Sequence, residues 1–93
     1  MRTTKYTNKF KTDYKREKSG QYGRKLDSLL RPIIDLLVDD KPLPKNIVDH
    51  SLSGKWADCR DCHIKPDFVM IYRKPDDETI ELVRLGSHSE LGL

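Results

Sequence analysis

The chain has 93 residues and a mass of 10.9 kDa, which is enough for one small domain and too little for two. Hydrophobic and charged residues each make up 35% of the sequence and the mean hydropathy is −0.75, a composition typical of a polar, folded protein. Charged residues interrupt the longest apolar cluster, residues 26–38, so no segment resembles the roughly 20 apolar residues of a transmembrane helix. The amino terminus has no apolar signal-peptide core, and we expect a single domain over residues 1–93 in the cytoplasm.

The net charge of +3 is unevenly distributed along the chain. Residues 1–25 contain nine basic and two acidic residues, a net charge of +7, whereas the remainder has a net charge of −4. A basic segment is typical of contact with a polyanion, because neutralised phosphates release their counterions. It is also typical of a solvated helix face, so charge alone leaves both interpretations open.

The amino-terminal half predicts one strand and two helices. Thr3, Thr4 and Tyr6 favour a strand over residues 2–6. Thr7 or Asn8 can cap a helix that continues to Lys18. A second helix is expected from Tyr22 to Val38, where Pro32 should bend it without ending it, because apolar residues recur with helical spacing at Leu26, Leu29, Leu30, Ile33, Ile34 and Leu37.

An irregular connection from Asp39 to about Leu52 precedes a change of period from 3.6 toward 2. Strands are expected over residues 55–60, 67–73 and 79–84, and the short links between them imply an antiparallel meander. The middle strand is apolar on both faces and is therefore expected to be central. The sequence predicts an α+β fold in which two amino-terminal helices cover one face of a small antiparallel sheet and leave the other face for a site.

The run Cys59-Arg60-Asp61-Cys62-His63 matches the pattern of covalent haem attachment. Haem attachment normally belongs to exported proteins, and Met70 lies too near in the sequence to serve as the distal ligand. A zinc site would need a second ligand pair beyond His63 and His50. We therefore expect two reduced thiols with packing roles and neither a metal nor another cofactor, with a metal- or haem-binding protein that uses Cys59, Cys62 and His63 as the remote alternative.

The three histidines, His50, His63 and His88, all lie in the carboxy-terminal half, near strand ends or in connections. A single histidine is most often a satisfied structural group. Three at the ends of adjacent elements favour an acid–base site instead. Histidine both accepts and donates a proton near neutral pH, which transesterification at an RNA phosphate requires.

From residue 49 to residue 88 a succession of short motifs occurs at fixed spacings: Asp49-His50-Ser51-Leu52, Gly54-Lys55-Trp56, Arg60-Asp61, His63, Pro66-Asp67-Phe68, Ile71-Tyr72 and Arg84-Leu85-Gly86-Ser87-His88. This succession resembles the YafQ branch of the RelE/ParE toxin superfamily, the mRNA interferases of bacterial type II toxin–antitoxin systems. Tyr22 and Leu43-Pro44 extend the resemblance to nearly the whole chain. It implies a RelE-like fold, with two helices packed on one face of a twisted antiparallel sheet.

The resemblance also implies an activity: ribosome-dependent, metal-independent cleavage of mRNA in the ribosomal A site, by attack of a ribose 2′-hydroxyl on the adjacent phosphate. His88 would be the general acid that protonates the leaving 5′-oxygen. His50 would be the base, with Asp67 as its competitor. Arg84 would contact the phosphate as charge builds in the transition state.

Further positions carry over as substrate contacts. His63 and Asp61 match site positions of the family, and Phe68 matches an aromatic residue that could stack on an unpaired base. Lys9, Lys11 and Lys15 are expected to face ribosomal RNA. Gly92 stands where the family pattern has an aromatic residue.

Simpler structural roles exist for some of these residues. Phe68 and Trp56 could belong to the core, and Arg84 could pair with Glu81 on the surface. Strict alternation along the last strand would place Arg84 on the same face as Leu82, away from a site on the other face.

The expected partners are a cognate DinJ/RelB-like antitoxin, the ribosome and mRNA, and operator DNA through the antitoxin complex, with no membrane partner. The alternative within the same fold is a ParE-like toxin that inhibits its target without cleaving RNA.

Overall fold

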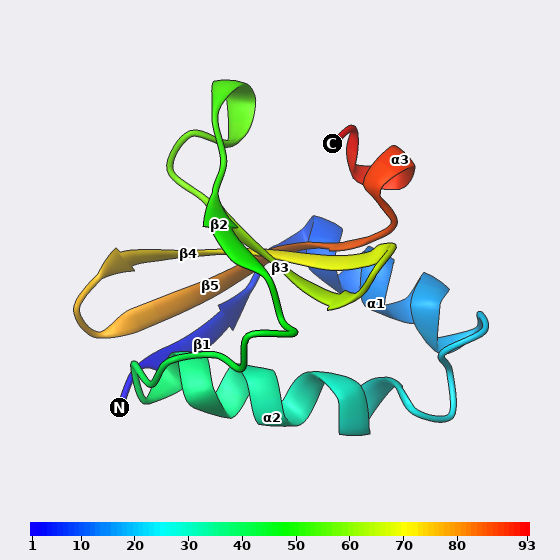
Figure 1. The fold of residues 1–93 in the computed structure, drawn as a ribbon, viewed down its shortest axis with the longest axis horizontal. Coiled ribbons are helices and arrows are strands. Elements are labelled where there is room, and N and C mark those ends of the chain that lie inside the picture. Colours follow the sequence, from blue (N-terminus) through cyan, green and yellow to red (C-terminus); the bar gives the residue numbers. More distant parts are fainter.

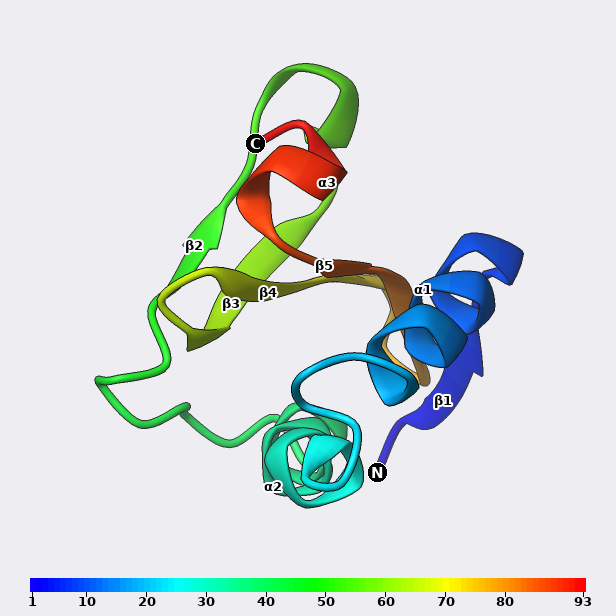
Figure 2. The ribbon, with the colours of Figure 1, turned by 90° about the vertical axis from the view of Figure 1, so that its right-hand side faces the viewer.

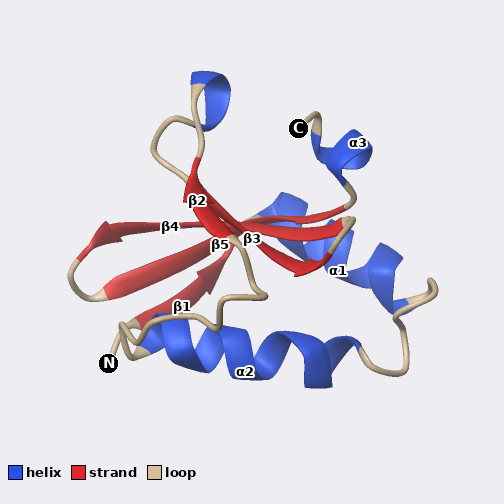
Figure 3. Cartoon of the chain, viewed as in Figure 1, coloured by secondary structure: helices blue, strands red, loops and turns tan.

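A five-stranded sheet with the strand order β1–β5–β4–β3–β2 lies at the centre of the computed structural model, which describes residues 1–93 (Figure 1). Figure 3 distinguishes its strands from its helices. The strands are β1 (Thr3–Tyr6), β2 (Asp49–Ser51), β3 (Arg60–Lys65), β4 (Phe68–Asp76) and β5 (Thr79–Gly86), and the helices are α1 (Asn8–Lys18), α2 (Leu26–Val38) and the short α3 (His88–Leu91).

The sheet is mixed, so the prediction of an entirely antiparallel sheet was wrong at one edge. β3, β4 and β5 form the expected antiparallel meander, and β2 extends it beside β3, but β1 pairs with β5 in parallel, from Thr3 opposite Thr79 to Tyr6 opposite Leu82. The chain runs from β1 through both long helices before it returns to the sheet at β2. A connection of this length lets β1 join the sheet beside β5, instead of forming a hairpin with its successor.

The two long helices form where the apolar period predicts them. Thr7 caps α1, since its Oγ1 accepts a hydrogen bond of 3.0 Å from the amide of Phe10. α2 continues through Pro32 but begins at Leu26, after a tight turn in which a Cβ on Gly23 would lie 2.2 Å from the carbonyl oxygen of Lys18. No helix of the molecule has the length and apolar character needed to cross a membrane.

The sheet separates two apolar clusters, and β4 contributes to both. Phe68, Met70 and Tyr72 point toward the larger cluster, which they share with Phe10 of α1 and the inner residues of α2. Val69 and Ile71 point to the smaller cluster on the other face, which α3 covers with Leu91. Figure 2 shows α2 and α3 on opposite sides of the sheet. The prediction that this strand is central and buried on both faces is confirmed.

Two segments between α2 and β4 differ from the prediction. Residues 55–59 of the strand expected over residues 55–60 are not in a strand, because Gly54 adopts a left-handed φ of 68° and starts a short 3-10 turn, and the strand begins only at Arg60. The expected irregular connection contains β2 (Asp49–Ser51), which pairs with β3. All three β2 residues are exposed, so no apolar alternation indicates this strand in the sequence.

Candidate active site

Three histidines lie in a row on the face of the sheet opposite α2. His50 comes from β2, His63 from β3 and His88 from α3. The ring centroid of His63 lies 5.3 Å from that of His50 and 5.0 Å from that of His88, and both ring pairs meet edge to face. The structure therefore brings together the three residues that the sequence singles out for acid–base chemistry.

Strand register places a buried carboxylate beside two of these rings. Asp61 and His63 lie two residues apart on β3 and so share a face, while His50 of β2 is directly opposite Asp61. Nδ1 of His50 lies 2.8 Å from Oδ1 of Asp61, and Nε2 of His63 lies 3.4 Å from Oδ2. Oδ1 of Asp61 and Nε2 of His63 are both buried and make no polar contact outside this cluster, and the Asp61 side chain is only 2% exposed.

A capping box at the start of α3 fixes the backbone of His88. Ser87 Oγ accepts a hydrogen bond from the Glu90 amide, and the Glu90 carboxylate accepts one from the Ser87 amide. Asp67, in the turn between β3 and β4, accepts two more: 3.0 Å from the His88 amide and 2.7 Å from Nδ1 of its ring. These two bonds hold the pKa of Asp67 below its ordinary value and leave Nε2 as the ring nitrogen of His88 without a protein partner.

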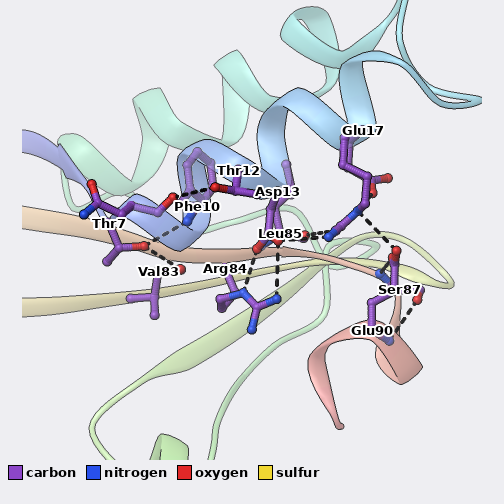
Figure 4. A network of polar contacts seen from close by, with 12 residues as sticks. Thr7, Phe10, Thr12, Asp13, Glu17, Val83, Arg84, Leu85, Ser87 and Glu90 are labelled. Atoms are coloured by element: carbon purple, nitrogen blue, oxygen red, sulfur yellow. Dashed lines mark hydrogen bonds and ion pairs between the residues drawn. The ribbon is translucent and has the colours of Figure 1, made fainter.

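A bulge in β5 places Arg84 on the histidine face. Leu82 is opposite Tyr72 and Arg84 is opposite Ile71, so Val83 is an extra residue between them. The extra residue reverses the alternation, and Arg84 therefore lies on the face opposite to Leu82, contrary to strict alternation. Its Nε donates to Asp13 of α1 over 2.7 Å (Figure 4). The surface pairing of Arg84 with Glu81 does not occur, since Glu81 pairs with Arg73.

Asp13 is the residue of this region that the sequence analysis missed. Its side chain is 4% exposed and accepts hydrogen bonds from Arg84, from the Leu85 amide and from Arg16. Burial by itself would raise the pKa of Asp13, but these donors outweigh burial and hold it below the ordinary value. The sequence contains one indication of this role: Asp13 follows Phe10 by one turn and therefore lies on the inner face of a lysine-rich helix.

The structure contradicts the proposed stacking of Phe68 on an RNA base. Phe68 is 1% exposed, and its ring stacks on Tyr22 with centroids 4.6 Å apart. The alternation of β4 directs it into the helix-side cluster, away from the histidines. Trp56 borders the smaller cluster, as a packing role requires.

The structure also contradicts the alternative site built from Cys59, Cys62 and His63. Cys59 belongs to the cluster on the histidine face and Cys62 to the cluster on the helix face, so the sheet separates the two thiols. Both are free and buried. Burial raises the pKa of Cys62 to about 12, which disfavours the thiolate that a metal needs.

Lys9, Lys11 and Lys15 lie exposed on α1 and form no ion pair. Lys11 and Lys15 line a groove between α1 and α2 that also contains Tyr6 and Tyr14. These lysines are separate from the row of histidines, on another part of the surface.

A different set of residues has the donors for a metal ion. One ligand atom each from His50, Asp61 and His63 lies within 4.8 Å of the other two. Two of the donors, Oδ1 of Asp61 and Nε2 of His63, have no other partner. Two imidazoles and one carboxylate suit a borderline cation such as Zn²⁺ or Cu²⁺.

Sequence comparison relates the whole chain to one family. A family model described as "Bacterial toxin of type II toxin-antitoxin system, YafQ" matches residues 2–92. The mRNA interferase toxin YafQ of Escherichia coli K12 is 34% identical over 85 residues, which cover 81% of this chain and 91% of that protein. A putative toxin YafQ of Haemophilus influenzae is 40% identical over 63 residues, 64% of this chain and 62% of that protein.

Solved structures extend the similarity to the fold. A copper-bound mutant toxin from Helicobacter pylori superimposes with a TM-score of 0.83 at 39% identity, covering 98% of this chain and 99% of that chain. YafQ in the DinJ–YafQ complex of E. coli superimposes with a TM-score of 0.79 at 29% identity, covering 98% of both chains.

Proposed function

Because the chain belongs to the YafQ family of toxins from type II toxin–antitoxin systems, we propose that it is an mRNA interferase that cleaves mRNA on the ribosome. The observation that carries the proposal is the row of three histidines, with a carboxylate beside each end and Arg84 on the same face of the sheet. Cleavage by a ribose 2′-hydroxyl needs a base, an acid and positive charge at the phosphate, and this face contains all three.

His88 is the general acid of the proposed reaction. Asp67 holds Nδ1 of the ring, so Nε2 is the nitrogen that donates the proton to the leaving 5′-oxygen. The same contact supports a positioning role for Asp67. A carboxylate that already accepts two hydrogen bonds and has a lowered pKa is a weak base, and we therefore assign the base to His50.

His50 is half exposed and can approach the 2′-hydroxyl, while the contact of its Nδ1 with Asp61 beneath it orients the ring. His63 lies between the acid and the base and orients the substrate between them. Arg84 lies two strands away from Asp61, about 10 Å along the sheet, and supplies the charge at the scissile phosphate. None of these roles requires a metal ion.

The test is cleavage of a defined mRNA on programmed ribosomes, mapped by primer extension. His88→Ala and His50→Ala should each lower the cleavage rate by about 10²–10⁴-fold, because each removes one proton transfer. Lys45→Ala, an exposed change in the loop before β2, is the matched control and should keep the full rate. Retained cleavage in both histidine variants would overturn the assignment, and growth arrest without any cleavage would indicate an inhibitory toxin of the ParE kind.

The partners of the proposed toxin are the ribosome and a cognate DinJ-like antitoxin, which can link it to operator DNA; a relative forms the DinJ–YafQ complex. Exposed, unpaired Lys9, Lys11 and Lys15 supply the basic surface for ribosomal RNA. Their triple change to Glu should weaken ribosome binding and flatten its dependence on salt. The matched double change of Lys41 and Lys45 to Glu, in the loop after α2, should leave binding intact, and equal losses in both variants would contradict a specific surface.

A second candidate function is binding of a divalent cation by His50, Asp61 and His63, favoured by the two donor atoms that have no other partner. The Helicobacter pylori relative is a copper-bound toxin. A cation here would occupy the imidazole assigned as the base and so inhibit cleavage. Titration of the purified protein with Cu²⁺ or Zn²⁺ tests this directly: binding should be lost in His63→Ala, and binding that persists in that variant would contradict the site.

A further inference from the structure

The outer edge of β5 lacks a strand neighbour in its second half. β1 pairs with β5 only as far as Leu82, where Tyr6 is its partner. Thr7 then closes the pairing, since its amide donates to the Leu82 carbonyl and its hydroxyl to the Val83 carbonyl. Beyond this point the backbone of Leu85 points its amide and its carbonyl away from β4, toward α1.

Two side chains of α1 take the place of the missing strand. Oδ2 of Asp13 accepts a hydrogen bond of 3.0 Å from the Leu85 amide, and Nη2 of Arg16 donates one of 2.8 Å to the Leu85 carbonyl. Asp13 and Arg16 also bond to each other, over 3.0 Å. One carboxylate and one guanidinium thus satisfy both backbone groups of the same residue, as a neighbouring strand would.

The carboxylate that replaces the strand also holds the side chain of Arg84. Nε of Arg84 donates to Oδ2 of Asp13 over 2.7 Å, and Nη2 donates to Oδ1 over 3.3 Å. This fork engages one edge of the planar guanidinium and leaves Nη1 without a partner in the protein. A guanidinium held along one edge keeps a fixed orientation and retains N–H groups for an anion.

The same helix reaches the segment that carries His88. Nε of Arg16 lies 3.2 Å from the Glu90 carboxylate, which also accepts a hydrogen bond from the amide of Ser87, the N-cap residue of α3. Gly86 lies beneath this contact: a Cβ there would lie 2.7 Å from Nη2 of Arg16 and 3.0 Å from Oε1 of Glu90. The arginine and the glutamate therefore occupy the space in which any other residue would place its side chain.

We propose that Asp13 is a positioning residue, which orients Arg84 toward the scissile phosphate and, with Arg16, fixes the β5–α3 segment that carries the general acid. The proposal rests on the function proposed above. The reason is preorganisation: a long arginine side chain that is already oriented loses little freedom when the transition state forms, whereas a free one must be ordered at that moment. Asp13 touches neither substrate nor reacting atoms and acts through Arg84.

A double-mutant cycle on kcat separates positioning from a merely structural role. Arg84→Ala should lower kcat by about 10²–10³-fold. Asp13→Asn, which keeps the shape but removes the charge, should lower kcat by about 10–100-fold in the wild-type background with little change in KM. In the Arg84→Ala background the same change should have no further effect. An equal loss in both backgrounds would overturn the proposal.

Asp27→Asn is the matched control for the cycle. Asp27 is also a carboxylate of the helical layer in an ion pair, with Lys18, but it has no contact with β5 or α3. Its change should leave kcat unaltered, and a loss equal to that of Asp13→Asn would show a general effect of charge in place of positioning.

A measurement on the unmodified protein covers the case in which Asp13→Asn does not fold. ¹⁵N relaxation of the arginine side chains should give Nε of Arg84 an order parameter near that of the backbone, about 0.85, and a much lower value for the exposed Arg31. Equal mobility of the two would overturn the proposal. This result does not depend on cleavage, so a failure of the proposed function, seen as undiminished cleavage in His88→Ala, is recognised separately.

Discussion

The two faces of the sheet differ in how much apolar surface they bury. The face toward α1 and α2 closes over a cluster of 14 buried residues, whereas the face under α3 closes over four. All three histidines, with Asp61 and Arg84, belong to the second face. Since buried apolar area supplies most of the stability of a fold, at about 25 cal/mol per Å², the helix face stabilises the domain and leaves the other face free for polar groups.

Asp61 illustrates what that division permits. A buried carboxylate whose only polar contacts are two imidazole rings lowers stability, and it persists where the rest of the structure holds it in place. Here β3 holds Asp61 between β2 and β4, and β4 is anchored in the large cluster on its other face. The stability of one face thus supports an unfavourable arrangement on the other.

The largest expected effect is on stability, from a change on the helix face. Phe68→Ala should lower the free energy of unfolding by about 3–5 kcal/mol, because it opens a cavity beneath Tyr22. Urea denaturation measures this loss. The cleavage rate per folded molecule should stay the same, and a fall in that rate would return Phe68 to a role in RNA binding.

A smaller loss of stability with a larger loss of activity is expected from Leu91→Ala. Leu91 is 2% exposed and anchors α3, so its truncation should lower the free energy of unfolding by about 2–3 kcal/mol and release the helix that carries His88. Leu93→Ala, at an exposed site two residues on, is the control. If Leu91→Ala cleaved at the wild-type rate per folded molecule, the packing of α3 would not be needed to position His88, and the face under α3 would not determine activity.

The contribution of Asp13 to stability should depend on pH. At about pH 7, Asp13→Asn should lower the free energy of unfolding by about 1.5–3 kcal/mol, because three donors lose a charged acceptor. The pKa of Asp13 is lower in the folded chain than its ordinary value of 3.8, so this contribution is complete above that value and vanishes as the pH falls through the folded pKa. Urea unfolding of both proteins from about pH 7 to about pH 2 should show the two stabilities converging in acid, and a constant gap would argue against the ion pair.

The smallest effect is expected from a thiol reagent, because Cys59 and Cys62 are both buried. Burial raises the pKa of Cys59 and raises that of Cys62 to about 12, so neither should react with Ellman's reagent in the folded protein. The urea-unfolded chain, with both thiols accessible, is the control. Rapid reaction of Cys59 in native buffer would show that the histidine face opens more readily than its packing indicates.

Elements with a strong apolar period were predictable from the sequence. The leucine and isoleucine spacing located α2, and the two apolar faces of residues 68–72 identified β4 as central. β2 was not predictable, because Asp49, His50 and Ser51 are all exposed and form a strand only through pairing with β3. The parallel position of β1 was also hidden, since local periodicity does not show which strands are neighbours.

The candidate site was predictable by residue type and unpredictable in its arrangement. The histidines and Arg84 were identified by their chemistry and by family resemblance. Arg84 reaches the correct face only through the bulge at Val83, which strict alternation does not reveal. Asp13 was hidden because a single acid among lysines looks like part of a solvated helix until the edge of β5 is placed against it.

The pairing of β1 with β5 also determines when the molecule can become active during its own synthesis. β1 is translated first, yet its neighbour in the sheet, β5, ends at Gly86, and α3 with His88 follows. The sheet cannot close, and the row of histidines cannot assemble, until the segment through His88 has left the ribosome that makes it. A nascent chain of this topology that stops before β5 therefore has neither a closed sheet nor a complete row of histidines.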